Sequence, residues 1–396
     1  MYIRLYFGIV RLMDPALNPY TPGSGRRPHS LQGRDREIEA FDLLVARAKA
    51  RRYDRGMILS GLRGVGKTAL LNHLRAHAEH HGWFTVRLEA QNSESGARVN
   101  HKQLATGLRH GLRKFSTKHA LKQAAEGVMG LIEGSSLSVG GVSVGAPTPR
   151  SAEDTLFDVE EIVEAASELV RSKGVALAVF VDEMQDLEAD LTAALIVTQH
   201  RASQEGWPFY VIGAGLPNLP AFLADSRSYA ERLFLYCKIG PLDDAAARQA
   251  LVDPAESVGG RYIPEALDKI VAAAEGYPYF LQEFGSAMWE VAAGTPFQLE
   301  DAELAIEAGT ALLDRGFFPS RWDRATPAER KYLRAIAATG ETAPKTSSLS
   351  IAQTTAGPLR AAAIRKGIVY SPEHGRISFT VPGMAAFIAR QIDTDE

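Results

Sequence analysis

The residues best suited to chemistry form one short segment, Gly61-Leu62-Arg63-Gly64-Val65-Gly66-Lys67-Thr68. Its glycines allow backbone N–H groups to face an anion, and Lys67 can reach the β- and γ-phosphates of a nucleotide. The Thr68 hydroxyl is suited to ligating Mg²⁺. The segment therefore predicts a site for ATP and Mg²⁺. The expected nucleotide contacts are Gly61, Arg63, Gly64, Val65, Gly66, Lys67, Thr68 and Ala69.

A second segment, Val179-Phe180-Val181-Asp182-Glu183, is an apolar run that ends in two acids. Asp182 is expected to bind both nucleotide and Mg²⁺ at this site, and Glu183 to polarise the attacking water. The two segments match the Walker A and Walker B patterns. Because two acids are present rather than one, hydrolysis is favoured over nucleotide storage, with Lys67 and Glu183 as catalytic residues.

Alternating strand and helix patterns are expected to position these residues. Apolar runs at 57–60, 84–88, 176–181 and 209–213 predict four strands with helices between them. The first run directly precedes the glycine-rich segment, and a helical pattern follows it, so the phosphates would lie at a helix N-terminus. Strands that alternate with helices predict a three-layer α/β core with a parallel sheet.

The rest of the chain predicts two further parts. From Leu242 to about Gly316, helical patterns separated by glycines suggest a helical lid. After Thr326, two helices followed by short strands at 368–370 and 377–379 suggest a winged helix-turn-helix. The expected organisation is an N-terminal tail or linker over 1–30, the ATPase core over 31–240, the lid over 241–316 and the winged-helix domain over 317–396.

Composition narrows the function classes. The 396 residues are 45% hydrophobic and carry a formal net charge of −3, which argues against a protein that coats nucleic acid over its whole surface. The single cysteine, Cys237, lies beside an apolar run and is interpreted as a core residue of a protein from a reducing compartment. No apolar run approaches the length of a membrane helix. A cytoplasmic protein is therefore expected.

Taken together, these motifs resemble the AAA+ and STAND branch of P-loop ATPases, and especially bacterial and archaeal origin-recognition-like ATPases with a C-terminal winged helix. The resemblance covers about residues 18 to 390. Residues 33–37, Gly-Arg-Asp-Arg-Glu, resemble the segment that lies near the adenine, and Gly276-Tyr277-Pro278 resembles the G-x-P motif of the lid. The resemblance implies that Pro278 and Tyr277 contact the base or sense the nucleotide from the lid, although a tight turn at a helix start explains this proline equally well.

The resemblance also implies an arginine that senses the γ-phosphate, often across a subunit interface. Arg232 is the candidate, with Arg227 and Arg201 as alternatives. A polar sensor is expected at the end of the fourth strand, but residues 212–217 are apolar and glycine-rich. This departure leaves γ-phosphate sensing open.

Three segments are candidates for the surface that binds a partner. A basic helix over 104–118 could contact nucleic acid or an acidic protein, or could be docked on the core with a solvated basic face. Residues 136–144 alternate around Gly140-Gly141 and predict a hairpin. The predicted winged helix of the tail could bind double-stranded DNA or a protein partner, and the sequence does not decide between them. The tail residues suited to phosphate contact are Arg360, Arg365, Lys366, His374 and Arg376.

The leading expectation is an ATP- and Mg²⁺-dependent switch ATPase that acts on DNA or loads a partner protein onto it. The alternative is a signalling switch whose ATP-bound form oligomerises and recruits a protein effector without binding DNA. A third interpretation is a nucleotide-binding scaffold without turnover. The ten histidines show no convincing metal-binding spacing, and no other enzyme class finds support.

Overall fold

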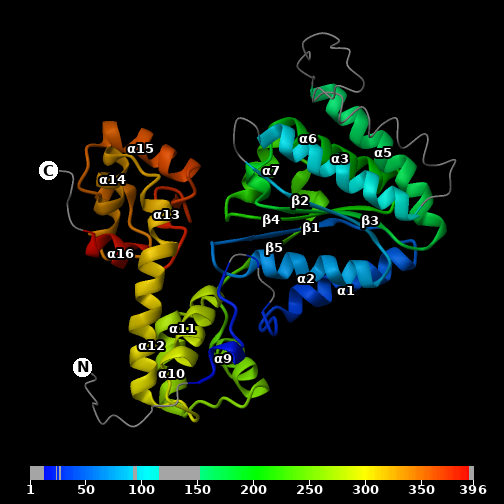
Figure 1. Ribbon diagram of the computed structural model, residues 1–396. Coiled ribbons are helices and arrows are strands. Elements are labelled where there is room, and N and C mark those ends of the chain that lie inside the picture. Colours follow the sequence, from blue (N-terminus) through cyan, green and yellow to red (C-terminus); the bar gives the residue numbers. More distant parts are fainter. Residues whose placement is uncertain (1–12, 24, 26–27, 92–95, 116–151, 392–396) are drawn as a thin grey trace, which may run out of the picture. The chain divides into compact units, whose positions relative to one another are not determined.

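The computed structural model describes residues 13–23, 25, 28–91, 96–115 and 152–391. The chain divides into two compact units (Figure 1). The sheet unit comprises residues 34–61 and 70–239. The helical unit comprises the residues up to 33, the loop 62–69 and the chain from 240 onward. The predicted hairpin at 136–144 lies outside the described residues.

A five-stranded parallel sheet forms the centre of the sheet unit, in the order β2-β3-β4-β1-β5. All its pairings are parallel, so the strands end at the same edge. Strands β1, β3 and β4 are buried along their whole length, which matches their continuous apolar sequences. The strands are β1 (Gly56–Gly61), β2 (Phe84–Glu89), β3 (Leu177–Asp182), β4 (Phe209–Gly215) and β5 (Phe234–Ile239).

Helices cover both faces of this sheet, which confirms the expected three-layer α/β fold. One face carries α1 (Asp35–Lys49) and α2 (Lys67–His80), and the other carries α3, α5 and α6 (Figure 1). Phe41 of α1 packs against Phe180 of β3, with ring centroids 6.3 Å apart. The remaining helices of the unit are α3 (Gly96–Phe115), α5 (Ala152–Ser172), α6 (Ala189–Glu205), α7 (Leu219–Ser226) and α8 (Ala230–Leu233).

Strand β5 was not predicted, and it places Cys237 at an edge of the sheet. Its exposure pattern mixes buried and exposed residues because only β1 pairs with it. Cys237 is half-buried, so the core interpretation holds only in part. Burial, with the charge of Glu37 adding to it, raises the pKa of the Cys237 thiol to about 11. The thiol is therefore protonated and unreactive at neutral pH.

The helical unit contains a bundle of four helices, as the sequence predicted for the lid. They are α9 (Asp244–Ser257), α10 (Pro264–Ala274), α11 (Pro278–Val291) and α12 (Leu299–Leu312). Residues 14–21, expected as a linker, pack on this bundle. Asn18 Nδ2 donates to Ser286 Oγ at 3.0 Å, and the Tyr20 hydroxyl lies 2.6 Å from the Leu251 carbonyl.

The C-terminal region follows α12 through a π-helical turn, Leu313–Phe317, and a short helix, α13 (Pro319–Trp322). It contains two longer helices and a two-stranded antiparallel hairpin, as expected. Helix α15 begins earlier than predicted, because Pro358 is accommodated within it. The elements are α14 (Pro327–Ala337), η4 (Thr346–Ser348), α15 (Gln353–Arg365), β6 (Val369–Tyr370), β7 (Ser378–Phe379) and α16 (Met384–Arg390).

Glu329 anchors this region from a buried position. Its carboxylate accepts hydrogen bonds from Thr326 N at 2.7 Å and from Lys366 Nζ at 2.6 Å, joining the start of α14 to the end of α15. Burial alone raises the pKa of Glu329, but the hydrogen bonds from Lys366 and Thr326 outweigh it and lower the pKa below its ordinary value. The ionised carboxylate therefore stabilises the folded region.

Glu329→Gln should lower the free energy of unfolding by about 1–3 kcal/mol at neutral pH, because it removes the charge from a buried hydrogen-bonded pair. Urea unfolding of the full chain measures this. Since the folded pKa is lowered, the contribution is present above the unfolded pKa and is lost as the pH falls through the folded one. Glu373→Gln is the matched control, because that carboxylate is 77% exposed and 3.8 Å from Arg376. Equal losses for both variants would contradict this role.

Candidate active site

The loop after β1 has the backbone geometry expected of a phosphate site. Gly64 and Gly66 have φ of 83° and 90°, a region that side chains disfavour. Helix α2 begins at Lys67, directly after the loop. Lys67 is buried, and its Nζ donates to the Leu62 carbonyl at 2.8 Å. The ammonium is therefore held over the loop that precedes it.

The start of α11 lies against this loop within the helical unit. The Tyr279 N–H donates to the Gly64 carbonyl at 3.2 Å. A Cβ added at Gly66 would lie 3.9 Å from Pro278 Cγ, so Pro278 is in the immediate surroundings of the loop. The Tyr279 ring in turn stacks on Phe317, with centroids 4.6 Å apart.

Two other parts of the helical unit also reach the loop. The Arg63 N–H donates to the carbonyl of Thr380, after β7, at 3.2 Å. A Cβ added at Gly25 would lie 2.8 Å from Thr68 Cγ2, so the N-terminal segment passes close to the Thr68 side chain. The loop is thus in contact with the N-terminal segment, the start of α11 and the C-terminal region.

The acidic pair lies at the end of β3. Asp182 is the last residue of the strand and is 8% exposed, and its Oδ1 accepts a hydrogen bond from Glu183 N at 3.0 Å. Glu183 has φ 48° and ψ 43°, a left-handed conformation that costs a non-glycine residue about 1–3 kcal/mol. The chain turns here into a short 3₁₀ helix, η2 (Met184–Asp186).

Gln185 is a site residue that sequence reasoning missed. Its Nε2 donates to Glu183 Oε2 at 2.7 Å, and its Oε1 accepts from Leu216 N at 3.0 Å. The amide therefore joins the catalytic candidate to the end of β4. A single glutamine after Asp-Glu carries no sequence signature for this role.

The same contacts explain why the sensor position is apolar and glycine-rich. A Cβ added at Gly215 would lie 2.4 Å from Gln185 Oε1, and one at Gly213 would lie 2.5 Å from Met184 Sδ. Residues that follow β3 pack against the end of β4 and leave no room for side chains at these two positions. The polar group at this strand end is Gln185.

The arginine candidates differ in their surroundings. Arg201 forms an ion pair with Glu160 at 2.9 Å and lies over the Trp207 ring, and Arg227 donates to the Ser226 carbonyl. Arg232 lies on α8 with an exposed side chain. All three side chains are exposed, so their exposure does not choose among them, and the role of Arg232 stays a prediction.

A polar cluster joins α3 to the start of α6. His101 Nε2 lies 2.9 Å from Glu188 Oε1 and 3.9 Å from Asp190, and the buried Asn100 donates to Glu188 at 2.8 Å. Burial raises the pKa of Glu188, but the hydrogen bonds from His101 and Asn100 outweigh it and lower the pKa. The three donor groups are close enough to hold a metal ion, yet the ion pair already accounts for their arrangement.

This cluster also bears on the predicted basic helix. Leu104 and Leu108 of α3 are buried against the sheet, whereas Arg109 is exposed. The described part of α3 is therefore a docked helix with a polar outer face. Lys118 lies outside the described residues.

Comparison with known proteins agrees with this fold. Residues 30–212 match the family described as AAA ATPase domain, and residues 315–388 match a domain of unknown function, DUF8462. A search of curated proteins found no significant match. The Walker-type ATPase PABY2304 of Pyrococcus abyssi is similar with a TM-score of 0.59 and 15% identity, over 94% of this chain and 99% of that one.

Two further solved structures are similar at lower scores. The Aeropyrum pernix ORC1 protein in complex with DNA has a TM-score of 0.49 and 16% identity, over 91% of this chain and 93% of that one. The Thermotoga maritima RuvB Holliday junction branch migration motor has a TM-score of 0.48 and 13% identity, over 92% and 99%.

The parallel sheet, the glycine-rich loop after β1 and the match of residues 30–212 to the AAA ATPase domain agree with one another. This domain match supports nucleotide binding and ATPase activity. Among the described helices, none is both long and apolar enough to cross a membrane.

Gly215→Ala tests the packing at the end of β4. The added methyl group would displace Gln185, and we expect a loss of about 1–3 kcal/mol in unfolding free energy, as for overpacked sites. Gly294→Ala is the control, because its Cβ would have open space around it. Chemical unfolding of both variants decides the point, and equal stability would show that Gln185 is not closely packed there.

Proposed function

We propose that the chain is a Mg²⁺- and ATP-dependent switch of the AAA+/STAND type. In this proposal, nucleotide at the loop 61–69 repositions the helical lid and a winged C-terminal region. In the leading version of the proposal, the switch acts on DNA or loads a partner protein onto DNA. The observation that carries the switch is the hydrogen bond from the Arg63 N–H of the loop to the Thr380 carbonyl of the C-terminal region.

This hydrogen bond matters because phosphates would use the same kind of group. Backbone N–H groups of the loop are the expected ligands of the nucleotide oxygens. An oxyanion that takes the Arg63 N–H would compete with Thr380, so nucleotide binding and the position of the C-terminal region would be linked. Tyr279 offers a second link, since its N–H bonds Gly64 and its ring stacks on Phe317.

The donor set suits Mg²⁺, which prefers hard oxygen ligands. The Thr68 hydroxyl and the Asp182 carboxylate would hold the ion, and its charge would offset that of the phosphates. Lys67 would contact the phosphates, and Glu183 would take a proton from the attacking water. Gln185 would orient Glu183, and Pro278 would border the base.

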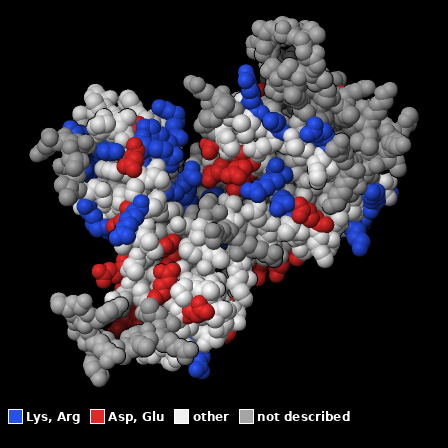
Figure 2. All heavy atoms as spheres, viewed as in Figure 1, with Lys and Arg blue, Asp and Glu red and all other residues white. Residues whose placement is uncertain are grey.

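The C-terminal region supports DNA as the leading partner. Its helices and hairpin are compatible with a winged helix-turn-helix, and Figure 2 shows Lys and Arg side chains gathered over this part of the molecule. Arg365 and His374 are exposed, one at the end of α15 and the other in the hairpin turn. In a winged helix these positions would face a groove and the backbone phosphates.

A specific observation favours the alternative, a protein-recruiting switch. Three of the five candidate phosphate contacts already make hydrogen bonds within the region: Arg360 to Ser371 Oγ, Lys366 to Glu329 and Arg376 to the Ala343 carbonyl. Fewer cations are then left for a nucleic acid. The exposed Arg232 would in this case complete the site of a second copy of the chain, as a trans-acting arginine does.

Steady-state ATP hydrolysis at low salt, with and without duplex DNA, tests the function. Glu183→Gln should lower kcat by about 10²–10⁴-fold while ATP still binds, because the variant loses the general base. DNA should stimulate the wild type, and that effect should weaken steeply with salt. ATP turnover that does not respond to DNA, together with ATP-dependent self-association, would support the protein-recruiting switch. If the wild type binds ATP but does not hydrolyse it, the chain would be a nucleotide-binding scaffold.

Gln185→Ala and Gln185→Glu test the positioning of Glu183. Both lose the hydrogen bond donated to Glu183, but the glutamate variant can still accept from Leu216 N. We expect each to lower kcat by about tenfold or more, a part of the general-base contribution, and to change ATP affinity little. Single-turnover hydrolysis and nucleotide titration separate these quantities. Wild-type kcat in both variants would remove Gln185 from the mechanism.

A further inference from the structure

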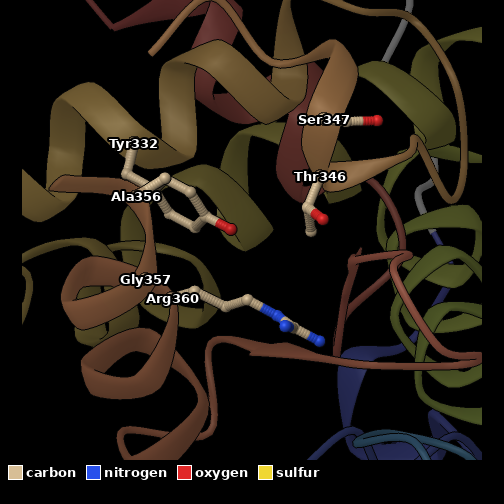
Figure 3. Close-up of a pocket in the computed structure, with 6 residues that line it drawn as sticks. All are labelled: Tyr332, Thr346, Ser347, Ala356, Gly357 and Arg360. Carbon is tan, nitrogen blue, oxygen red and sulfur yellow. The ribbon is translucent and has the colours of Figure 1, made fainter. Parts of the chain in front are cut away.

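A recess in the C-terminal region is unrelated to the residues assigned above to ATP. It has a volume of about 200 Å³ and is lined by Tyr332 of α14, Thr346 and Ser347 of η4, and Ala356, Gly357 and Arg360 of α15 (Figure 3). All six residues lie in the segment that matches the domain of unknown function. Helices α14 and α15 and the connection between them therefore form an open recess with both apolar and polar lining atoms.

Tyr332 places an unsatisfied donor in this recess. The residue is fully buried, and its hydroxyl has no hydrogen-bond partner among the described residues. Figure 3 shows the hydroxyl directed toward the same space as the Arg360 guanidinium and the Thr346 side chain. Burial raises the pKa of Tyr332, with the Arg360 charge opposing it in part, so the hydroxyl is protonated at neutral pH. A buried donor without an acceptor is unfavourable unless a ligand supplies one.

Arg360 adds a positive charge without an acidic partner. One Nη donates to Ser371 Oγ at 2.8 Å, which fixes the side chain across the recess. Its Nε is buried and has no hydrogen-bond partner, and no carboxylate of the described residues lies within ion-pair distance. A guanidinium held in this way favours an anion, and its planar fork suits a phosphate.

We propose that this recess binds the phosphate group of a small molecule, with Arg360 and the Tyr332 hydroxyl as its donors. Thr346 donates to the Gly375 carbonyl at 3.1 Å, which leaves its oxygen as an acceptor for a protonated phosphate. The volume leaves room for a small organic substituent beside the phosphate. A duplex backbone fits less well, because the Tyr332 side chain that supplies one donor is fully buried.

Calorimetric titration of the full chain tests the site, with saturating ADP and Mg²⁺ to occupy the loop 61–69. The probes are inorganic phosphate and glycerol 3-phosphate. Arg360→Gln should weaken their binding about tenfold or more, and Tyr332→Phe by several-fold, as expected for charged and neutral hydrogen bonds. Lys331→Gln is the control, because Lys331 is on α14 next to Tyr332 and its side chain is exposed. It should leave binding unchanged.

A second measurement separates binding from folding. Tyr332→Phe should not lower the unfolding midpoint without ligand, because the hydroxyl it removes has no partner, and phosphate should raise the midpoint less than in wild type. Tungstate-soaked crystals should show an anomalous peak between Arg360 and Tyr332.

Binding that is unchanged in Arg360→Gln and Tyr332→Phe would overturn the proposal. So would loss of duplex DNA binding in Arg360→Gln when wild type binds neither small probe, since the recess would then serve a backbone phosphate.

Discussion

Backbone N–H and C=O groups outside helices and sheets still require partners, and this requirement connects the loop 62–66 to the rest of the helical unit. Gly64 and Gly66 have φ of 83° and 90°, which are not the conformations of a right-handed helix or a strand. The partners are the N–H of Tyr279 at the start of α11 and the carbonyl of Thr380 after β7. These partners come from distant parts of the sequence. An anion that takes the Arg63 N–H would compete with Thr380, whereas Gly64 bonds α11 through its carbonyl, which an anion does not displace. The same short loop therefore offers N–H groups to an anion and is hydrogen-bonded to α11 and to the C-terminal region.

Close packing also determines which residue types can occupy the ends of β3 and β4. The chain after Asp182 turns through a left-handed Glu183 and packs η2 against β4 so closely that Gly213 and Gly215 have no space for a side chain. A polar sensor on β4 would collide with Gln185. Gln185 instead spans the two strands, from the Glu183 carboxylate to the Leu216 amide. The polar group at this strand end therefore comes from η2, which follows the neighbouring strand β3.

The sequence predicts those features whose causes are local. Buried parallel strands read as continuous apolar runs, and the loop carries its glycines and lysine in consecutive positions, so four strands and the acidic pair were predictable. Strand β5 was missed because an edge strand mixes exposed and buried residues, as at Leu235 and Phe234. Gln185 was missed because its partner Leu216 is 31 residues away. The recess was missed because only tertiary packing brings Tyr332 beside Arg360.

The cations of the C-terminal region show why charge in a sequence does not specify a partner. Lys366 and Arg365 are adjacent, yet Lys366 is bonded to the buried Glu329 and Arg365 is exposed. Arg360 is on the same helix, but it lines the recess together with Tyr332 (Figure 3). The same positive charge thus stabilises the fold at Lys366, is exposed to solvent at Arg365, and is the proposed anion ligand at Arg360. The neighbouring carboxylate, or its absence among the described residues, decides among these roles. A count of basic residues would have assigned all three to DNA.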